Sequence, residues 1–169
     1  ACRACLAAVM DILREEGTRL LAAGGGVGAI AAGARVVCLY FSARWCPDCV
    51  PATPVLRDVY EDAAGGSDWD VVYVPSDKNA TETEEYVKAA HGGWPRVETN
   101  SDVAAKLKRR FGVCARKEAG SLGITERKAG IPTLVVLDAH SGDTIEMDGM
   151  TAIRKSGPRA IKAWLAKAE

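Results

Sequence analysis

The sequence predicts one α/β domain, in which a central mixed β-sheet is flanked by helices. Two apolar runs rich in β-branched and aromatic residues, Val36–Ser42 and Trp69–Pro75, are typical of strands buried on both faces. The stretch Pro47–Ala64 between them predicts a helix, so the two strands should run parallel. Two later apolar runs flank His140-Ser141-Gly142 and predict an antiparallel hairpin. Helical crossovers together with a hairpin indicate an α/β sandwich.

The 169 residues suit a single domain, 1–169, with a core of its own. Starting from the N-terminus, amphipathic spacing predicts a helix over 1–16 that ends at Gly17. The remaining expected elements are a short strand at Thr18–Ala22, helices at Thr81–Ala90, Ser101–Phe111 and Pro158–Lys167, and hairpin strands at Ile131–Asp138 and Asp143–Met147.

The composition is that of an ordinary globular protein, with 48% hydrophobic and 26% charged residues. The 22 basic and 22 acidic residues balance, so we expect neither a nucleic-acid partner nor a membrane partner. Leu20–Phe41 is largely apolar, but Arg35 and a glycine run argue against a membrane span. Six cysteines fit a reducing compartment in which one pair cycles, which favours a cytoplasmic protein.

The motif Cys46-Pro47-Asp48-Cys49 follows the first long strand. Proline is favoured at a first helical position, so a helix beginning at Pro47 would leave Cys46 exposed at its N-terminus. Backbone N–H groups and the helix dipole stabilise an anion there. The thiolate is the reactive form of cysteine, so this placement predicts a nucleophilic Cys46.

A Cys-x-x-Cys pair is also half of a zinc site, but zinc needs four ligands. The only histidines, His91 and His140, are in no paired ligand motif, so we expect no metal. A pair that follows a strand, opens a helix and carries Trp45 before it is typical of a thioredoxin-like redox motif. The second pair, Cys2 and Cys5, lacks this context, and its functional and structural interpretations both stay open.

These motifs resemble the tryparedoxin and nucleoredoxin branch of the thioredoxin superfamily. The resemblance rests on Tyr40-Phe41-Ser42-Ala43-x-Trp45-Cys46-Pro47-x-Cys49, Thr53-Pro54, Gly130-Ile131-Pro132-Thr133-Leu134 and His91-Gly92-Gly93-Trp94. It implies a thioredoxin-like sandwich and a thiol–disulfide oxidoreductase of cell redox homeostasis. The expected partners are disulfide-containing protein substrates and, as electron donor, a low-molecular-weight thiol or a reductase. A monomer is the default state of this fold.

The implied mechanism passes through a mixed disulfide. Cys46 attacks the substrate and Cys49 resolves the intermediate, so the redox-active Cys46–Cys49 disulfide replaces any other cofactor. Trp45 would shield the pair, and a cis Ile131–Pro132 bond would leave the Ile131 backbone free to pair with substrate. The alternative is an interaction or signalling protein of the same fold that binds partners at this surface without turnover.

Three features depart from the family pattern. Asp48 stands where a second proline is usual, and its carboxylate should disfavour the Cys46 thiolate, with Arg44 offsetting part of this effect. Tyr40 replaces the buried acid of thioredoxins, which leaves Tyr40 itself or a water as candidate proton acceptors for Cys49.

The third departure is an insertion at residues 114–130, before the Ile-Pro-Thr motif. We expect either a loop or small helix that restricts partner choice at the rim of the site, or a surface excursion without function. Cys114 within it is a third redox thiol or simply packed, and Cys38 should be an inert core thiol.

Overall fold

The computed structural model describes residues 8–15 and 17–169. Helices and strands alternate along most of the chain, as the sequence predicts. The helices are α2 (Ala8–Arg14), α3 (Cys49–Asp62), α4 (Ala80–Ala90), α5 (Asp102–Phe111), η1 (Arg116–Glu118, a 3₁₀ turn), α6 (Ala119–Leu122), α7 (Gly149–Ser156) and α8 (Pro158–Leu165). The strands are β1 (Leu20–Leu21), β2 (Val36–Ser42), β3 (Trp69–Pro75), β4 (Arg96–Val97), β5 (Thr133–Asp138) and β6 (Thr144–Glu146).

Six strands form one mixed sheet in the order β1-β4-β3-β2-β5-β6. The long strands β2 and β3 are parallel, because α3 carries the chain back between them. β5 is antiparallel to β2 and forms the expected hairpin with β6. The predicted α/β class and mixed sheet are therefore confirmed.

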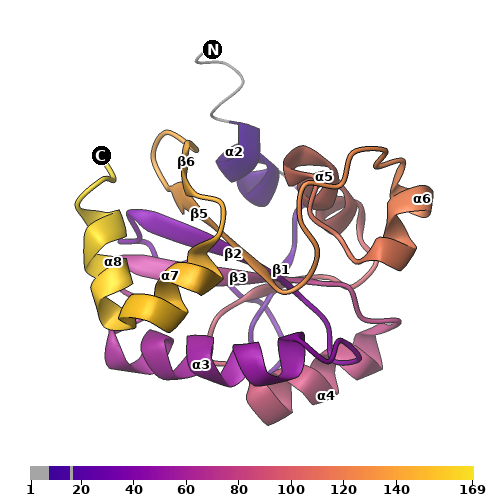
Figure 1. Ribbon diagram of the computed structural model, residues 1–169, viewed down its shortest axis with the longest axis horizontal. Helices are drawn as coiled ribbons and strands as arrows, with labels where there is room; N and C mark the ends of the chain where they lie inside the picture. The colour runs from indigo at the N-terminus through magenta and orange to yellow at the C-terminus, as the bar shows by residue number, and fades with distance from the viewer. Residues whose placement is uncertain (1–7, 16) are drawn as a thin grey trace.

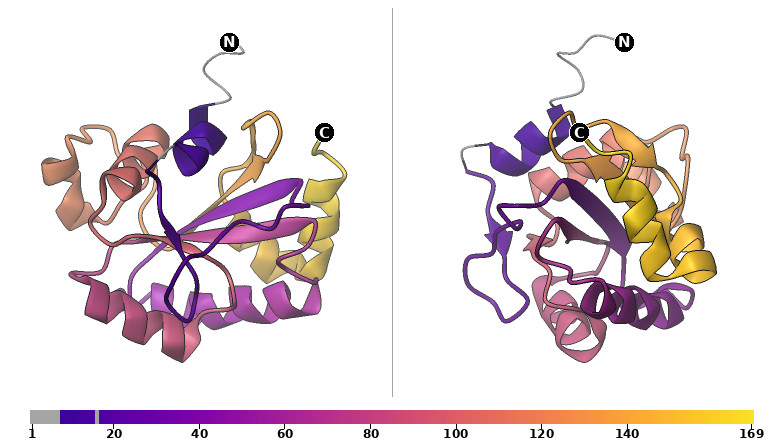
Figure 2. Two further views of the ribbon diagram at one scale, coloured as in Figure 1. Left: turned by 180° about the vertical axis from the view of Figure 1, so that it is seen from behind. Right: turned by 90° about the vertical axis from the view of Figure 1, so that its left-hand side faces the viewer.

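Helices cover both faces of this sheet. In Figure 1, α3 and α4 lie below it and α2 and α5 lie above it, and the views in Figure 2 show the same layers. Alternate residues of β2 serve the two cores: Val36, Cys38 and Tyr40 face the α3 side. Val37, Leu39 and Phe41 face the α5 side. This period of two explains why every residue of β2 is buried.

The structure differs from the sequence prediction at several places, among them the start of α3 and two elements, β4 and α7, that the sequence analysis does not contain. Helix α3 begins at Cys49 rather than Pro47, because residues 47 and 48 form a turn in which the Cys46 carbonyl accepts from the N–H groups of Cys49 and Val50. Helix α7 was not predicted, although Asp148 caps it and Met150 and Ile153 are buried under it. Gly157 separates α7 from α8, so the periodic signal is broken into two short pieces.

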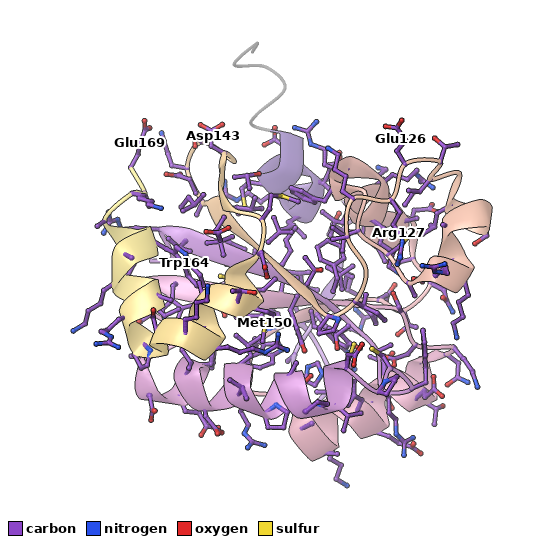
Figure 3. The ribbon with its side chains drawn as sticks, viewed as in Figure 1. Glu126, Arg127, Asp143, Met150, Trp164 and Glu169 are labelled. Atoms are coloured by element: carbon purple, nitrogen blue, oxygen red, sulfur yellow. The ribbon has the colours of Figure 1, made fainter. Side chains whose placement is uncertain are left out.

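The predicted N-terminal helix is confirmed in part, since α2 occupies the second half of 1–16. Cys2 and Cys5 lie outside the described residues. Met150 and Trp164, labelled in Figure 3, pack from α7 and α8 against the α3 side of the sheet. No helix within residues 8–15 and 17–169 combines the length and the apolarity needed to cross a membrane.

Candidate active site

The two cysteines of the motif lie where β2 ends and α3 begins. Both are free thiols in this structure. Cys49 is fully buried, and Cys46 is 5% exposed. The expectation of an exposed Cys46 is wrong, because Trp45 and Ile131 pack against the Cys46, Cys49 and Ala43 cluster.

The two thiols differ in their electrostatic surroundings. The N–H of Cys49 donates to Cys46 Sγ at 3.3 Å, which stabilises negative charge on that sulfur. Burial, followed by the hydrogen bond with Cys46, raises the pKa of Cys49 to about 12, although hydrogen bonds with Ser42 and the Ala43 backbone partly offset the rise. At neutral pH Cys49 is therefore a neutral thiol. This asymmetry favours Cys46 as the nucleophile.

A layer of hydroxyl groups lies beneath Cys49, and we call Tyr40, Ser42, Thr53 and Tyr86 the hydroxyl floor. Tyr40 Oη and Thr53 Oγ1 are 2.7 Å apart, and Thr53 also bonds to Tyr86. The Tyr86 and Thr53 hydroxyls lie 3.2 and 3.1 Å from the Cys49 carbonyl oxygen, and their two protons are shared between that oxygen and the Thr53–Tyr86 hydrogen bond. Every polar group of this layer is thereby paired in a dry environment.

Tyr40 is not the hydroxyl that borders the Cys49 thiol. Its oxygen bonds to Thr53, and burial raises its pKa far above the ordinary value, so at neutral pH it stays a protonated phenol and does not act as a base toward Cys49. Ser42 takes the place next to Cys49 instead. The sequence motif that contains Ser42 does not indicate its contact with Cys49. Tyr86 lies 37 positions after Cys49, so no local pattern indicates their hydrogen bond.

Trp45 forms one wall of the site. It is half-buried, and its indole N–H donates to the Ser76 carbonyl at 2.8 Å. Lys117 Nζ lies 3.5 Å from the centroid of the indole ring, a cation–π contact. The predicted shielding role of Trp45 is consistent with this geometry.

Arg44, Pro47 and Asp48 lie at the outside of the site. Pro47 and Asp48 are exposed in the turn before α3, and the Asp48 side chain makes no capping hydrogen bond. The Arg44 guanidinium pairs with Glu85, and its backbone N–H donates to Asp77 at 2.7 Å. The expectation that Arg44 offsets the charge of Asp48 finds no support, because Glu85 takes its charge.

The loop before β5 forms the opposite wall. The Ile131–Pro132 peptide bond is cis, as the resemblance implied. The Cys46 thiol lies 3.7 Å from the Ile131 carbonyl oxygen and donates to it. Ile131 and Pro132 are therefore brought to the nucleophile from 85 positions along the chain.

A pocket of about 570 Å³ opens beside Cys46. Residues 114–130, which we call the rim segment, form much of its wall. The lining consists of Trp45, Cys46, Ala115, Arg116, Lys117, Arg127, Gly130 and Ile131. The rim segment contains η1 and α6, at the edge of the molecule opposite α8 (Figure 1). It thus lies at the site, as one of the two sequence interpretations required.

The other cysteines have structural surroundings. Cys38 and Cys114 are fully buried, and burial raises the pKa of both thiols. Both are therefore protonated and shielded, which fits packed cysteines. Within the part of the chain that the structure describes, no three His, Cys, Asp or Glu side chains are grouped to hold a metal ion.

Comparison with known proteins agrees with this geometry. A family model described as thioredoxin-like matches residues 33–144. The tryparedoxin of Trypanosoma brucei brucei is 29% identical over 87% of this chain and 91% of its own length. A probable nucleoredoxin 2 of Oryza sativa subsp. japonica is 31% identical over 75% of this chain, which spans only 28% of that longer protein.

Among solved structures, tryparedoxin II in complex with glutathionylspermidine has a TM-score of 0.67 and 25% identity. The match covers 90% of this chain and 94% of that one. The chain belongs to the thioredoxin-like family, whose tryparedoxin and nucleoredoxin members are thiol–disulfide oxidoreductases.

Proposed function

We propose that this protein reduces disulfides through its Cys46–Cys49 dithiol. The observation that carries the proposal is the asymmetry of the pair. Cys46 receives the N–H of Cys49 and borders a pocket, whereas Cys49 is buried with a pKa of about 12. A nucleophile at the opening and a protected second thiol one turn behind it are what a two-step exchange requires.

In the first step the Cys46 thiolate attacks one sulfur of the substrate disulfide. A Cys46–substrate bond forms, the substrate S–S bond breaks, and the leaving thiolate takes a proton. Cys49 then attacks Cys46 Sγ as its proton passes to the expelled thiolate or to solvent, and the Cys46–Cys49 disulfide closes. Two electrons pass from the protein to the substrate, and the Ser42 hydroxyl stabilises the Cys49 thiolate as it forms.

The substrate side of the exchange is proposed by analogy with relatives. The solved tryparedoxin II complex holds glutathionylspermidine, a small thiol conjugate. For this chain we propose protein disulfides and low-molecular-weight disulfides as oxidants, with a small thiol or a reductase restoring the dithiol. The cis Ile131–Pro132 bond places the Ile131 backbone beside Cys46, which supports pairing with an extended substrate segment.

The test uses the reduced protein and a disulfide-bonded peptide, followed by mass spectrometry after acid quenching. The wild type should form the Cys46–Cys49 disulfide, and Cys49→Ser should stop at the mixed disulfide. Cys46→Ser, the matched control, should form neither. The redox equilibrium against glutathione should then give a midpoint of roughly −200 to −270 mV. A pair that never closes would favour a protein that binds partners without turnover.

A further inference from the structure

The pocket beside Cys46 has a one-sided charge. Three of the residues that line it, Arg116, Lys117 and Arg127, are cationic. None of the described residues in its lining is acidic. All three cationic side chains belong to the rim segment, so the positive charge comes from the part of the chain that departs from the family pattern.

The one acidic residue of η1 is turned away from the pocket. Glu118 accepts from Lys108 Nζ at 2.6 Å, from the Ser76 hydroxyl at 2.7 Å and from the Ala115 N–H at 2.9 Å. Lys108 is nearly fully buried and also donates to the Pro75 carbonyl at 2.9 Å. The Glu118 charge is thus compensated inside the protein, and its neighbours Arg116 and Lys117 are left at the surface.

Two of the cationic groups are held in place. Lys117 lies over the ring of Trp45, the residue that precedes Cys46 in the sequence. Arg127 donates to the Cys114 carbonyl at 3.1 Å, and its guanidinium lies against Gly130, where a Cβ would come within 3.0 Å of it. Figure 3 shows Arg127 beside α6 on its inner side, with Glu126 above it at the outer edge of the molecule.

The other carboxylates near the site do not cancel this charge. Glu85 is paired with Arg44, and neither residue is part of the pocket lining. Asp48 is exposed in the turn before α3 and is not part of the lining. A ligand that reaches Cys46 through the pocket therefore meets fixed positive charge.

We infer that the pocket selects small disulfides that carry carboxylates, with glutathione disulfide as the test compound. This inference rests on the proposed function and names its substrate class. The volume of the pocket lies within the ~300–1,000 Å³ range of small-ligand sites. Carboxylates at the ends of such a disulfide would pair with Lys117 and Arg127 while its sulfur lies at Cys46. Glutathionylspermidine carries a cationic polyamine, which this pocket should disfavour.

The chemistry balances within one turnover. Cys46 displaces one glutathione thiolate from glutathione disulfide and forms a Cys46–glutathione bond. Cys49 then displaces the second glutathione, and the Cys46–Cys49 disulfide forms. The reduced protein supplies both electrons, and each released thiolate takes a proton from Cys49 or from solvent.

The test measures single-turnover rates of the pre-reduced protein at low salt with disulfides of different charge. These are glutathione disulfide and three compounds of similar size: anionic dithiodipropionate, neutral bis(2-hydroxyethyl) disulfide and cationic cystamine. Each rate is divided by the rate of the same disulfide with dithiothreitol, which removes intrinsic reactivity. We expect dithiodipropionate to exceed cystamine by about tenfold or more, and the ratio to fall with added salt.

The double variant Lys117→Gln/Arg127→Gln should lose most of this preference. It should also reduce glutathione disulfide more slowly than the wild type does. Lys162→Gln, which removes one exposed positive charge on α8 at the opposite end of the molecule, should keep both. A neutral disulfide that is reduced as fast as the anionic one would overturn the inference and leave the proposed function standing.

If no disulfide is reduced, the proposed function fails, and the pocket can still be judged without turnover. In Cys49→Ser, alkylation of Cys46 by anionic iodoacetate is compared with alkylation by neutral iodoacetamide, each relative to free cysteine. A normalised iodoacetate-to-iodoacetamide ratio above one supports the anion preference if the double variant lowers it. A ratio of one or less refutes it.

Discussion

Cys46 and Cys49 are three residues apart, yet they lie in two different environments. Beneath Cys49 is the hydroxyl floor, built from β2, α3 and α4, fully buried and internally hydrogen-bonded. Beside Cys46 is the rim segment, with charged side chains at an open pocket. We expect the floor to set when the second thiol ionises, and the rim to set which charges approach the first. The two properties come from separate stretches of chain, so each can change without the other.

The largest expected effect is on stability, and it concerns the Glu118–Lys108 ion pair that anchors the rim segment to the protein. Glu118→Gln leaves the nearly buried Lys108 ammonium without its counter-charge, and breaking such a pair costs about 3 kcal/mol. Urea unfolding should show that loss in the free energy of unfolding. Glu126→Gln, an exposed carboxylate of the same segment, is the matched control and should change it by less than about 0.5 kcal/mol. Equal effects of the two variants would mean that Glu118 does not anchor the rim.

The next effect concerns the floor. His91 packs edge-on against Tyr73 and Tyr86 and accepts from Trp94 Nε1 at 3.1 Å. The residue is half-buried, and its Nε2 is shielded from solvent. Burial, followed by the charge of Arg96, lowers its pKa to about 3. The unfolded chain has the ordinary value of about 6.5, so protonation favours unfolding at lower pH. This contribution to stability is complete above pH 6.5 and is lost as pH falls towards 3, by up to about 1.4 kcal/mol per pH unit.

Thermal or urea unfolding between pH 7 and pH 4 tests this dependence. His91→Gln should be less stable at pH 7 but should lose less stability on acidification than the wild type. His140→Gln, at an exposed histidine, should follow the wild-type curve. Parallel curves for all three proteins would contradict a neutral His91 in the folded protein.

The smallest expected effect is that of Asp48. Its exposed carboxylate lies two residues after Cys46, and Asp48→Asn should raise the alkylation rate of Cys46 by neutral iodoacetamide about two- to fivefold at pH 7 and low salt. The reduction potential should rise with it, because the thiolate form of the reduced pair is favoured. Asp62→Asn, at the other end of α3, is the control. An unchanged or slower rate in Asp48→Asn would remove Asp48 from the electrostatics of the site.

The sequence was sufficient to predict the elements that depend on local pattern. The apolar runs placed β2 and β3 residue for residue, and Ser101 and Gly112 mark the ends of α5 as its cap residues. The motif and the resemblance also indicated the redox pair and the cis Ile131–Pro132 bond. These features are encoded within a few residues of one another.

What the sequence did not predict depends on contacts between distant residues. Cys46 is covered by Ile131, and Arg44 pairs with Glu85 in a helix that starts 36 residues later. Glu118 sits in a run of charges that is usually read as solvated, and only the fold brings Lys108 to it. Periodicity reports which face of an element is apolar, but it does not report which polar partner lies across a turn.

The lengths of the strands have a consequence for how damaged forms of this protein behave. Both edges of the sheet are formed by short strands, β1 with two residues and β6 with three, while the long apolar strands lie inside. A short edge offers few unpaired backbone groups to a second molecule. Local opening at the β6 edge would uncover β5, whose central residues are valine and leucine. Loss of β6 should therefore lead to self-association before it leads to loss of redox chemistry.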